Sequence, residues 1–343
     1  FSSATMADNV EKTLPTSNEN SEISSRILEI IFEFALNKVD DSVERLTAGT
    51  SKFLPTIDRF VNEGKRVELC LPAFPFKSAN KVYKVFGVLP DKGEELALER
   101  LNRMCERIRG VYKPGAKLTI LSDGVVYNDL LSVPDRHVWQ FGEALRAMAT
   151  KKKFKHLGFV RIKDVVKING LPEPLKEISY VANATNFRCA LLNEYGKEGI
   201  DIDEEIANNP DTRLTFQGYQ KFLESDLEHI YPTGEDRSSE QYKEDVSFLA
   251  KQMLTRGYAF ARAIEAGFPN HLRLSIHKST GEQKITMSLL DTKTGYTTPW
   301  HCSVALMADG QWLSAPMGEF KKNPNMEIVK EEGRPMYFKE KKV

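Results

Sequence analysis

The sequence has few of the features that mark disulfide-rich, secreted or membrane proteins. Its four cysteines show no CxxC motif and no metal-ligand spacing, which predicts reduced thiols in an intracellular protein: Cys70, Cys105, Cys189 and Cys302. No apolar run approaches the roughly 20 residues needed to span a bilayer. Residues 1–20 lack the basic start and apolar stretch of a secretory signal. We therefore expect a cytoplasmic protein with no membrane partner.

An excess of charge of either sign is also missing. The 48 basic residues balance 48 acidic residues among 343, which argues against a dedicated nucleic-acid-binding protein but permits a local basic cluster around an anion. The glycines match neither a P-loop nor a GxGxxG motif, and no Gly-x-Ser-x-Gly motif occurs. The sequence thus predicts no nucleotide cofactor and no nucleic-acid partner.

The hydrophobic patterning predicts an α/β fold. A strand at 66–71, a helix at 94–109, a strand at 118–121 and a helix at 136–153 alternate along the chain. Further helical patterns occupy 22–38, 173–195, 212–230 and 238–266, and strand patterns of period two occupy 272–276, 284–290, 302–307 and 311–315. We expect a disordered N-terminus over 1–20, one domain over 21–320, and a charged, solvated tail over 321–343.

The first candidate site is the loop that follows the first predicted strand. Two prolines, Pro72 and Pro75, stiffen the sequence from Pro72 to Asn80, which contains Lys77. Open α/β sheets bind ligands at the carboxyl ends of their strands. Burial beside Phe74 and Phe76 would lower the pKa of Lys77, which would make it a base or an anchor for an anion. The alternative interpretation is a surface lysine in a turn.

A carboxylate follows the next predicted strand in the same way. Asp123, in Ser122-Asp-Gly124, is a candidate to grip a substrate amine or to act as a general base, with Asp129 as a second carboxylate nearby. The alternative is an ordinary Asp-Gly turn. On pattern alone, Arg188 and Arg256 fit a structural ion pair and a surface role, respectively.

The sharpest pattern lies in the C-terminal third. Period two places His271, Arg273, Ser275 and His277 on one face of a strand. A guanidinium can bind a carboxylate or a phosphate, and an imidazole can move protons near pH 7. The alternative is a solvated sheet face. His301 could join His277 across the sheet, but these two histidines have no close third partner, so a metal site is not predicted.

The order of these motifs resembles the pyoverdine/dityrosine biosynthesis family. The resemblance rests on Leu71-Pro-Ala-Phe-Pro-Phe-Lys-Ser-Ala-Asn80, Leu89-Pro-Asp-Lys-Gly-Glu-Glu-Leu-Ala-Leu98, Tyr112-Lys-Pro-Gly-Ala116, Ser122-Asp-Gly124, Arg256-Gly257, Leu272-Arg-Leu-Ser-Ile-His277 and Thr298-Pro-Trp-His301. It covers roughly residues 25–320.

The resemblance implies an isocyanide synthase and a single Rossmann-like domain. Its central sheet would be flanked by helices, with a strand-rich C-terminal third and no cofactor. The α-amine of an amino acid of the Tyr, Trp or Val type would condense with the C2 ketone of ribulose 5-phosphate, and carbon–carbon cleavage would leave an isonitrile. A fused or partner oxygenase or synthetase domain is compatible with this activity. The alternatives are an enzyme that forms an N-formyl amino acid and a non-catalytic module that binds a sugar phosphate.

Such a reaction needs a base, an acid, cations for a phosphate and a carboxylate, and a dry site. We expect Lys77, Arg256 and Arg273 to bind the phosphate and the carboxylate, Asp123 to hold the amine, and His277 or His301 to serve as acid or base. Further candidate substrate-binding residues are Lys84, Asp129, Arg188, Phe76 and Trp300.

Overall fold

The centre of the molecule is a parallel sheet, as predicted for an α/β protein. The computed structural model describes residues 17–36, 43–279, 284–292 and 294–342. The sheet has the strand order β3-β2-β1-β4-β5. Its strands are β1 (Val67–Pro72), β2 (Ala116–Leu121), β3 (Leu157–Val160), β4 (Leu272–Ser275) and β5 (Ile285–Thr286). This is a doubly wound order, in which the chain moves outward from β1 and then returns to its other side.

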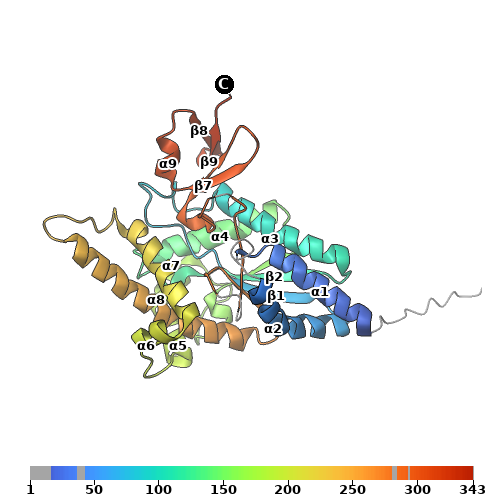
Figure 1. Ribbon diagram of the computed structural model, residues 1–343. Coiled ribbons are helices and arrows are strands. Elements are labelled where there is room, and N and C mark those ends of the chain that lie inside the picture. The colour runs from blue at the N-terminus through green and yellow to red at the C-terminus, as the bar shows by residue number, and fades with distance from the viewer. Residues whose placement is uncertain (1–16, 37–42, 280–283, 293, 343) are drawn as a thin grey trace, which may run out of the picture.

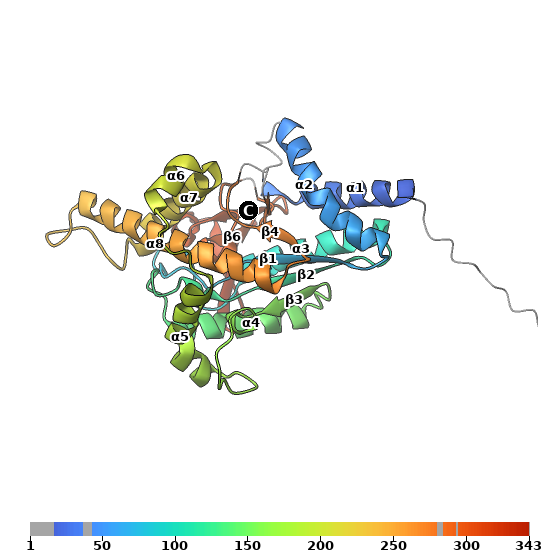
Figure 2. The same cartoon turned by 90° about the horizontal axis from the view of Figure 1, so that it is seen from below.

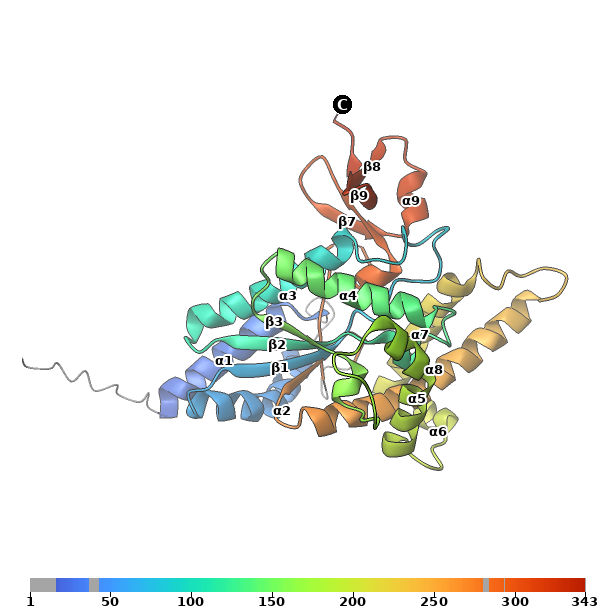
Figure 3. The same ribbon diagram turned by 180° about the vertical axis from the view of Figure 1, so that it is seen from behind.

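Helices cover both sides of this sheet. The helices α3 (Lys92–Val111) and α4 (Asp135–Lys151) lie on one side of the strands, and α2 (Val43–Asn62) lies on the other (Figure 3). The central strand buries Leu69 and Leu71 on one face and Cys70 on the other, as expected for a strand covered on both faces. The fold is therefore the predicted Rossmann-like domain.

The chain between β3 and β4 forms a helical insert. It contains α5 (Glu177–Tyr195), α6 (Ile202–Asn208), α7 (Pro210–Leu227) and α8 (Ser239–Gly267). The insert lies at the opposite end of the sheet from α1 (Ser17–Glu33) and α2 (Figure 2). The predicted helices agree with α5, α7 and α8, whereas α2, α6 and β3 were not predicted. The four residues of β3 are only half-buried and show no alternation, so they give little periodic signal.

The N-terminal prediction needs a correction at its boundary. Residues 17–20, expected to be disordered, form the first turn of α1, and the helix ends at Glu33. Residues 1–16 and 37–42 lie outside the described residues.

A second, smaller sheet stands beyond α3 and α4 (Figure 1). It has the order β7-β6-β9-β8, with β6 (Ser303–Leu306), β7 (Trp312–Ala315), α9 (Met317–Lys321), β8 (Met326–Glu331) and β9 (Arg334–Glu340). The expectation of a solvated tail from residue 321 is therefore wrong for residues 326–340. The strand β9 buries Met336 and Phe338 in alternation between polar and charged neighbours, and the many Lys and Glu residues conceal this pattern.

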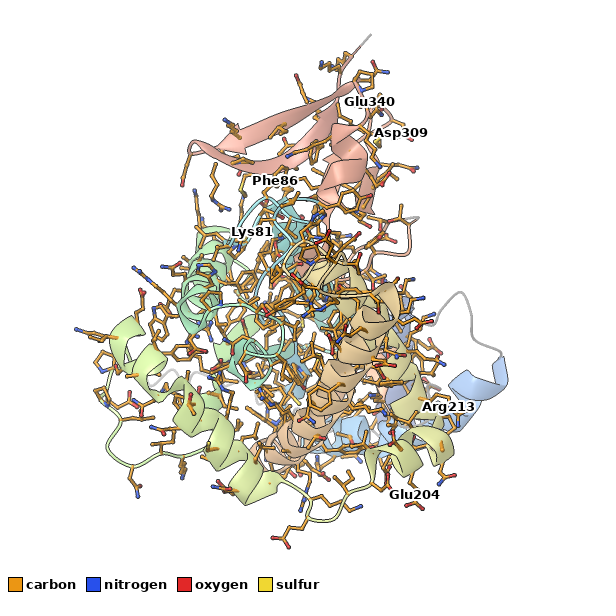
Figure 4. The ribbon with its side chains drawn as sticks, turned by 90° about the vertical axis from the view of Figure 1, so that its left-hand side faces the viewer. Lys81, Phe86, Glu204, Arg213, Asp309 and Glu340 are labelled. Atoms are coloured by element: carbon orange, nitrogen blue, oxygen red, sulfur yellow. The ribbon has the colours of Figure 1, made fainter. Side chains whose placement is uncertain are left out.

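Phe338 joins the small sheet to the main domain. Its ring stacks on Phe86 with centroids 5.1 Å apart and also contacts Phe320. Figure 4 shows Phe86 at the base of the sheet, with Asp309 and Glu340 near its outer end.

Replacing Phe338 with Ala should lower the free energy of unfolding by about 3 to 5 kcal/mol, because it removes a buried aromatic ring and leaves a cavity. Urea denaturation followed by circular dichroism measures the change. Ile328→Ala is the matched control, since Ile328 pairs directly with Phe338 but is 42% exposed. Equal losses in the two variants would show that the C-terminal strands do not depend on this contact.

Candidate functional site

A large cavity opens at the carboxyl ends of β1, β2 and β4. Its volume is about 1230 Å³. It lies at the switch point where the chain reverses direction around β1, which is where doubly wound sheets bind ligands. Of the residues predicted for the site, the cavity is lined by Phe76, Asp123, Arg273, His277, Trp300 and His301. The predicted residues Lys77, Lys84, Asp129, Arg188 and Arg256 do not line it.

Lys77 is fully buried in an ion-pair cluster beside the cavity. Its Nζ lies 3.0 Å from Asp91 Oδ2 and 3.0 Å from both carboxylate oxygens of Glu94, and it donates to the Pro299 carbonyl at 3.1 Å. Burial alone would lower the pKa of Lys77, but the two carboxylates outweigh it, so this pKa is raised. The expectation of a lowered pKa is therefore wrong, because the neighbouring aromatic rings are not its dominant surroundings.

The two carboxylates around Lys77 also begin a helix. Asp91 is the N-cap of α3 and accepts from Gly93 N, while Glu94 accepts from Asp91 N, which makes a capping box. A Cβ on Gly93 would lie 3.0 Å from Pro299 Cβ, so glycine lets the helix start approach the short helix η4 (Pro299–His301). The loop after β1, the start of α3 and η4 are thus tied together at one buried ammonium.

The aromatic wall of the cavity depends on a second close approach. A Cβ on Gly124 would fall 2.1 Å from a Phe76 ring carbon and 2.6 Å from the Pro75 carbonyl oxygen. Only glycine allows the loop after β1 to lie directly on the turn after β2. Trp300, on the other wall, packs edge-on against Phe74 with centroids 5.3 Å apart.

Asp123 reaches the cavity, but its oxygens already have protein partners. It accepts from Val125 N at 3.1 Å, from Ile162 N at 2.8 Å and from the Tyr180 hydroxyl. These bonds hold the short helix η2 (Gly124–Val126) and the start of the segment after β3. The amine-binding role of Asp123 stays a prediction that competes with three protein donors.

Three further predicted residues, Arg188, Arg256 and Asp129, form ion pairs with one another away from the cavity. Arg256 makes a bidentate pair with Asp129, and Arg188 lies 3.9 Å from Asp129 and 3.1 Å from Asp135. Both arginines also donate to carbonyls of η2, at Val126 and Val125. They fasten η2 to α8 and α5, so both arginines support the site rather than line it, and the structural ion pair considered for Arg188 on pattern alone is present.

Two half-buried cations face the cavity with no carboxylate against them. Arg273, on β4, donates from Nε to the Leu274 carbonyl, and Lys284 precedes β5. Within the described ranges neither forms an ion pair, although Asp211 raises the pKa of Lys284 and Glu265 that of Arg273 at longer range. Burial lowers the pKa of both groups. A desolvated cation without a partner is costly, so this end of the cavity favours an anion.

The two predicted histidines lie together at the cavity. The His277 ring packs edge-on against Tyr219, with centroids 5.2 Å apart, and burial together with Lys284 and Arg273 lowers its pKa to about 3. The His301 ring stacks on Phe222 at 4.5 Å, and burial lowers its pKa as well. Both imidazoles are therefore neutral at pH 7 and can accept a proton.

Lys84 also pairs inside the protein. Its Nζ contacts Asp226 Oδ1 and donates to Ser225 Oγ at 2.9 Å. The other oxygen of Asp226, Oδ2, lies 3.0 Å from His301 Nδ1. This chain of contacts joins the loop after β1, the end of α7 and η4.

Several cavity residues were not predicted from the sequence. Lys284, Tyr219 and Tyr258 line the cavity, and Asp226 supports it. One signal was present for Asp226, because it falls on the apolar stripe of α7 with Tyr219, Leu223 and Leu227, where a charge needs a partner. Lys284 gives no such signal, since it only precedes a strand.

The described ranges contain neither a membrane-spanning helix nor a cluster of metal-binding side chains. No helix there is both long and apolar enough to cross a lipid bilayer. No group of three or more His, Cys, Asp or Glu side chains there is placed to hold a metal ion.

The chain is similar to proteins of one family over most of its length. A family model described as pyoverdine/dityrosine biosynthesis protein matches residues 57–329. The isocyanide synthase–NRPS hybrid crmA of Aspergillus fumigatus is 59% identical over 319 residues, which are 93% of this chain and 20% of that protein. Isocyanide synthase xanB of the same organism is 40% identical over 345 residues, covering 96% of this chain and 44% of that protein. The chain thus spans less than half the length of these relatives.

The fold has a solved counterpart. The crystal structure of PvcA from Pseudomonas aeruginosa superposes with a TM-score of 0.79 at 26% identity, covering 92% of this chain and 99% of that one.

Lys77→Met should destabilise the protein by about 3 to 5 kcal/mol, because it leaves two buried carboxylates without their counter-ion. Urea denaturation at pH 7.5 measures the loss. Lys113→Met is the control, since Lys113 is exposed and its removal should change stability by less than about 0.5 kcal/mol. Equal stability of both variants would contradict the structural role of Lys77.

The depressed pKa of His277 predicts a pH-dependent stability. An unfolded histidine titrates near pH 6.5, whereas His277 in the folded protein titrates at about 3, so its contribution is complete above pH 6.5 and is lost as the pH falls toward 3. Between pH 7.5 and pH 5, wild-type should lose about 1 to 2 kcal/mol more than His277→Gln. His229→Gln, at an exposed site, should follow wild-type. A parallel pH dependence of His277→Gln and wild-type would refute the shift.

Proposed function

Because the chain belongs to the pyoverdine/dityrosine biosynthesis protein family, we propose that it is an isocyanide synthase, which converts the α-amine of an amino acid into an isonitrile. Two of its relatives carry the name isocyanide synthase, one of them within a hybrid. The setting proposed is cytoplasmic, with an oxygenase or a synthetase, fused or separate, working on the product.

The observation that carries this proposal is the pair of half-buried cations in the cavity. Arg273 and Lys284 face the same space without a carboxylate partner in the described part of the chain. A guanidinium offers two parallel hydrogen bonds to a phosphate or carboxylate, and an ammonium adds a second charge. Substrates with those groups, an amino acid and a sugar phosphate, would satisfy both cations at once.

The carbon donor proposed is ribulose 5-phosphate. Its phosphate would lie at Arg273 and Lys284, and its C2 ketone would then extend toward His277, whose pKa burial and both cations lower. A neutral amine must attack this ketone, so a group with a free lone pair has to remove the proton of the ammonium. The neutral His301 and His277 have the required protonation state. Phe76 and Trp300 would limit water, which hydrolyses imines.

The other predicted residues then take supporting roles in the proposal. Lys77 ties the loop after β1 to α3 and η4, and Lys84 balances Asp226. Arg188 and Arg256 hold Asp129 and η2. None of these cations is free to bind a substrate without breaking an ion pair.

Mass spectrometry of the product tests the function directly. The purified chain would receive ribulose 5-phosphate carrying ¹³C at C2, with Tyr, Trp and Val offered separately. A labelled isonitrile from one amino acid is expected. A labelled N-formyl amino acid alone, under rapid dry quenching, would replace the proposal with a formyl-forming enzyme. Stabilisation by the sugar phosphate without any labelled product would indicate a non-catalytic binding module.

Removing either cavity cation should weaken use of the sugar phosphate. Arg273→Met and Lys284→Met should each lower kcat/KM for ribulose 5-phosphate by about 10- to 100-fold, because each removes a charge-assisted contact of about 1.5 to 3 kcal/mol. Steady-state kinetics measures this, with exposed Lys113→Met as control. Unchanged kinetics in both cavity variants would remove these two residues from the substrate site.

A further inference from the structure

Asp226 is a buried carboxylate with two different partners. It lies near the end of α7, in the helical insert, and is 1% exposed. Oδ1 contacts the ammonium of Lys84, which is 2% exposed. Oδ2 lies 3.0 Å from His301 Nδ1. In the described ranges both Oδ2 and Nδ1 are buried and neither makes a well-oriented hydrogen bond, so their 3.0 Å contact is the polar contact that each has.

The His301 side chain is also part of the cavity wall. Its ring is held flat against Phe222, with an interplanar angle of 27°. A neutral imidazole carries one proton, and the hydrogen bond made by one nitrogen decides which nitrogen keeps it. A carboxylate can only accept a hydrogen bond, so it selects the tautomer with the proton on Nδ1.

We infer that Asp226 is a positioning residue: it fixes the proton of His301 on Nδ1 and thereby leaves the Nε2 lone pair free to act as a general base in the cavity. The identity of the proton that this base removes rests on the proposed function; the tautomer itself does not. Lys84 is part of this arrangement, because its positive charge balances the buried negative charge of Asp226 when His301 is neutral.

The charges around His301 agree with this arrangement. The groups that face it are Asp226 from α7, Lys84 and Lys77 from the loop after β1, and His277 beyond β4. Burial alone would raise the pKa of Asp226, but His301 and Lys84 bring it to about 2, so this carboxylate is ionised at neutral pH. Burial lowers the pKa of His301 despite Asp226.

A purely structural role for Asp226 is the competing explanation. In that case the carboxylate would only neutralise Lys84, and the tautomer of His301 would not depend on it. The two explanations differ in whether Asp226 determines which ring nitrogen of His301 carries the proton. This protonation can be observed without any substrate.

Long-range ¹H–¹⁵N NMR of the full chain, labelled at its six histidines, reports which ring nitrogen is protonated. The His301 signals are assigned by their loss in His301→Gln. At pH 7.5 we expect a protonated Nδ1 and an unprotonated Nε2. A protonated Nε2, or an equal mixture of tautomers, overturns the inference on wild-type protein alone.

Substitution then tests the cause. Asp226→Asn should shift His301 toward the Nε2-protonated form. Because this variant leaves Lys84 uncompensated, the double variant Lys84→Met/Asp226→Leu removes both charges and the acceptor oxygen and should show the same shift in a folded protein. Asp245→Asn, at an exposed site on α8, should leave the His301 signals unchanged. An unaltered tautomer in the folded double variant refutes the role of Asp226.

Kinetics separates this inference from the proposed function. If isonitrile forms, Asp226→Asn or the double variant should lower kcat by about 100-fold or more, as expected for a lost general base, with KM for the sugar phosphate within about 3-fold. The acidic limb of the pH–kcat profile should also move. If wild-type forms no isonitrile, the proposed function fails while the tautomer still decides the inference. A kcat unchanged in a folded variant that has lost the Nδ1 proton would overturn the catalytic part.

Discussion

The buried ammonium of Lys77 is the contact on which the geometry of the site depends. It joins the loop after β1 to both capping-box carboxylates of α3 and to the first carbonyl of η4. These segments are far apart in sequence, and Lys77 and Pro299 are separated by 222 residues. His301 is two residues beyond that carbonyl, so its place at the cavity follows from this cluster. A positive charge at the start of a helix opposes the helix dipole, and only the two carboxylates make it favourable there.

The charged residues around the cavity fall into two groups, those with an ion-pair partner and those without one. Those that fasten segments are matched within the protein, as Lys84 is by Asp226 and Arg256 by Asp129. Arg273 and Lys284 in the cavity have no such match in the described part of the chain. Removing these unmatched cations from water lowers the stability of the folded protein, and a bound anion would offset that loss. This contrast, rather than the number of basic residues, distinguishes a binding site from a scaffold in a chain of zero net charge.

The sequence predicted what local periodicity determines. The helices α3, α4 and α8 and the strands β1, β2 and β4 have strong apolar patterns and were found close to their observed bounds. The loop containing Lys77 was recognised as special, but its role was misjudged, since its partners are a helix cap and a carbonyl that only the tertiary fold brings near. Asp226 was missed for the same reason, because 142 residues separate it from Lys84. Periodicity predicts which face of an element a residue occupies, whereas the charges of its neighbours in the tertiary fold determine its role there.

The protonation states constrain how one site could both remove and return a proton. His277 and His301 are both neutral at pH 7, so neither begins as an acid. Under the proposed function, the proton taken from the amine would convert His301 to an imidazolium, and ionised Asp226 would stabilise that charge at 3.0 Å. His277 has no carboxylate in the described ranges to do the same, and Lys284 and Arg273 oppose its protonation. The same imidazolium would then be available to protonate the leaving hydroxide of the carbinolamine, so one histidine with one buried carboxylate could serve both steps. His277 would take part as a neutral ring that accepts or donates hydrogen bonds.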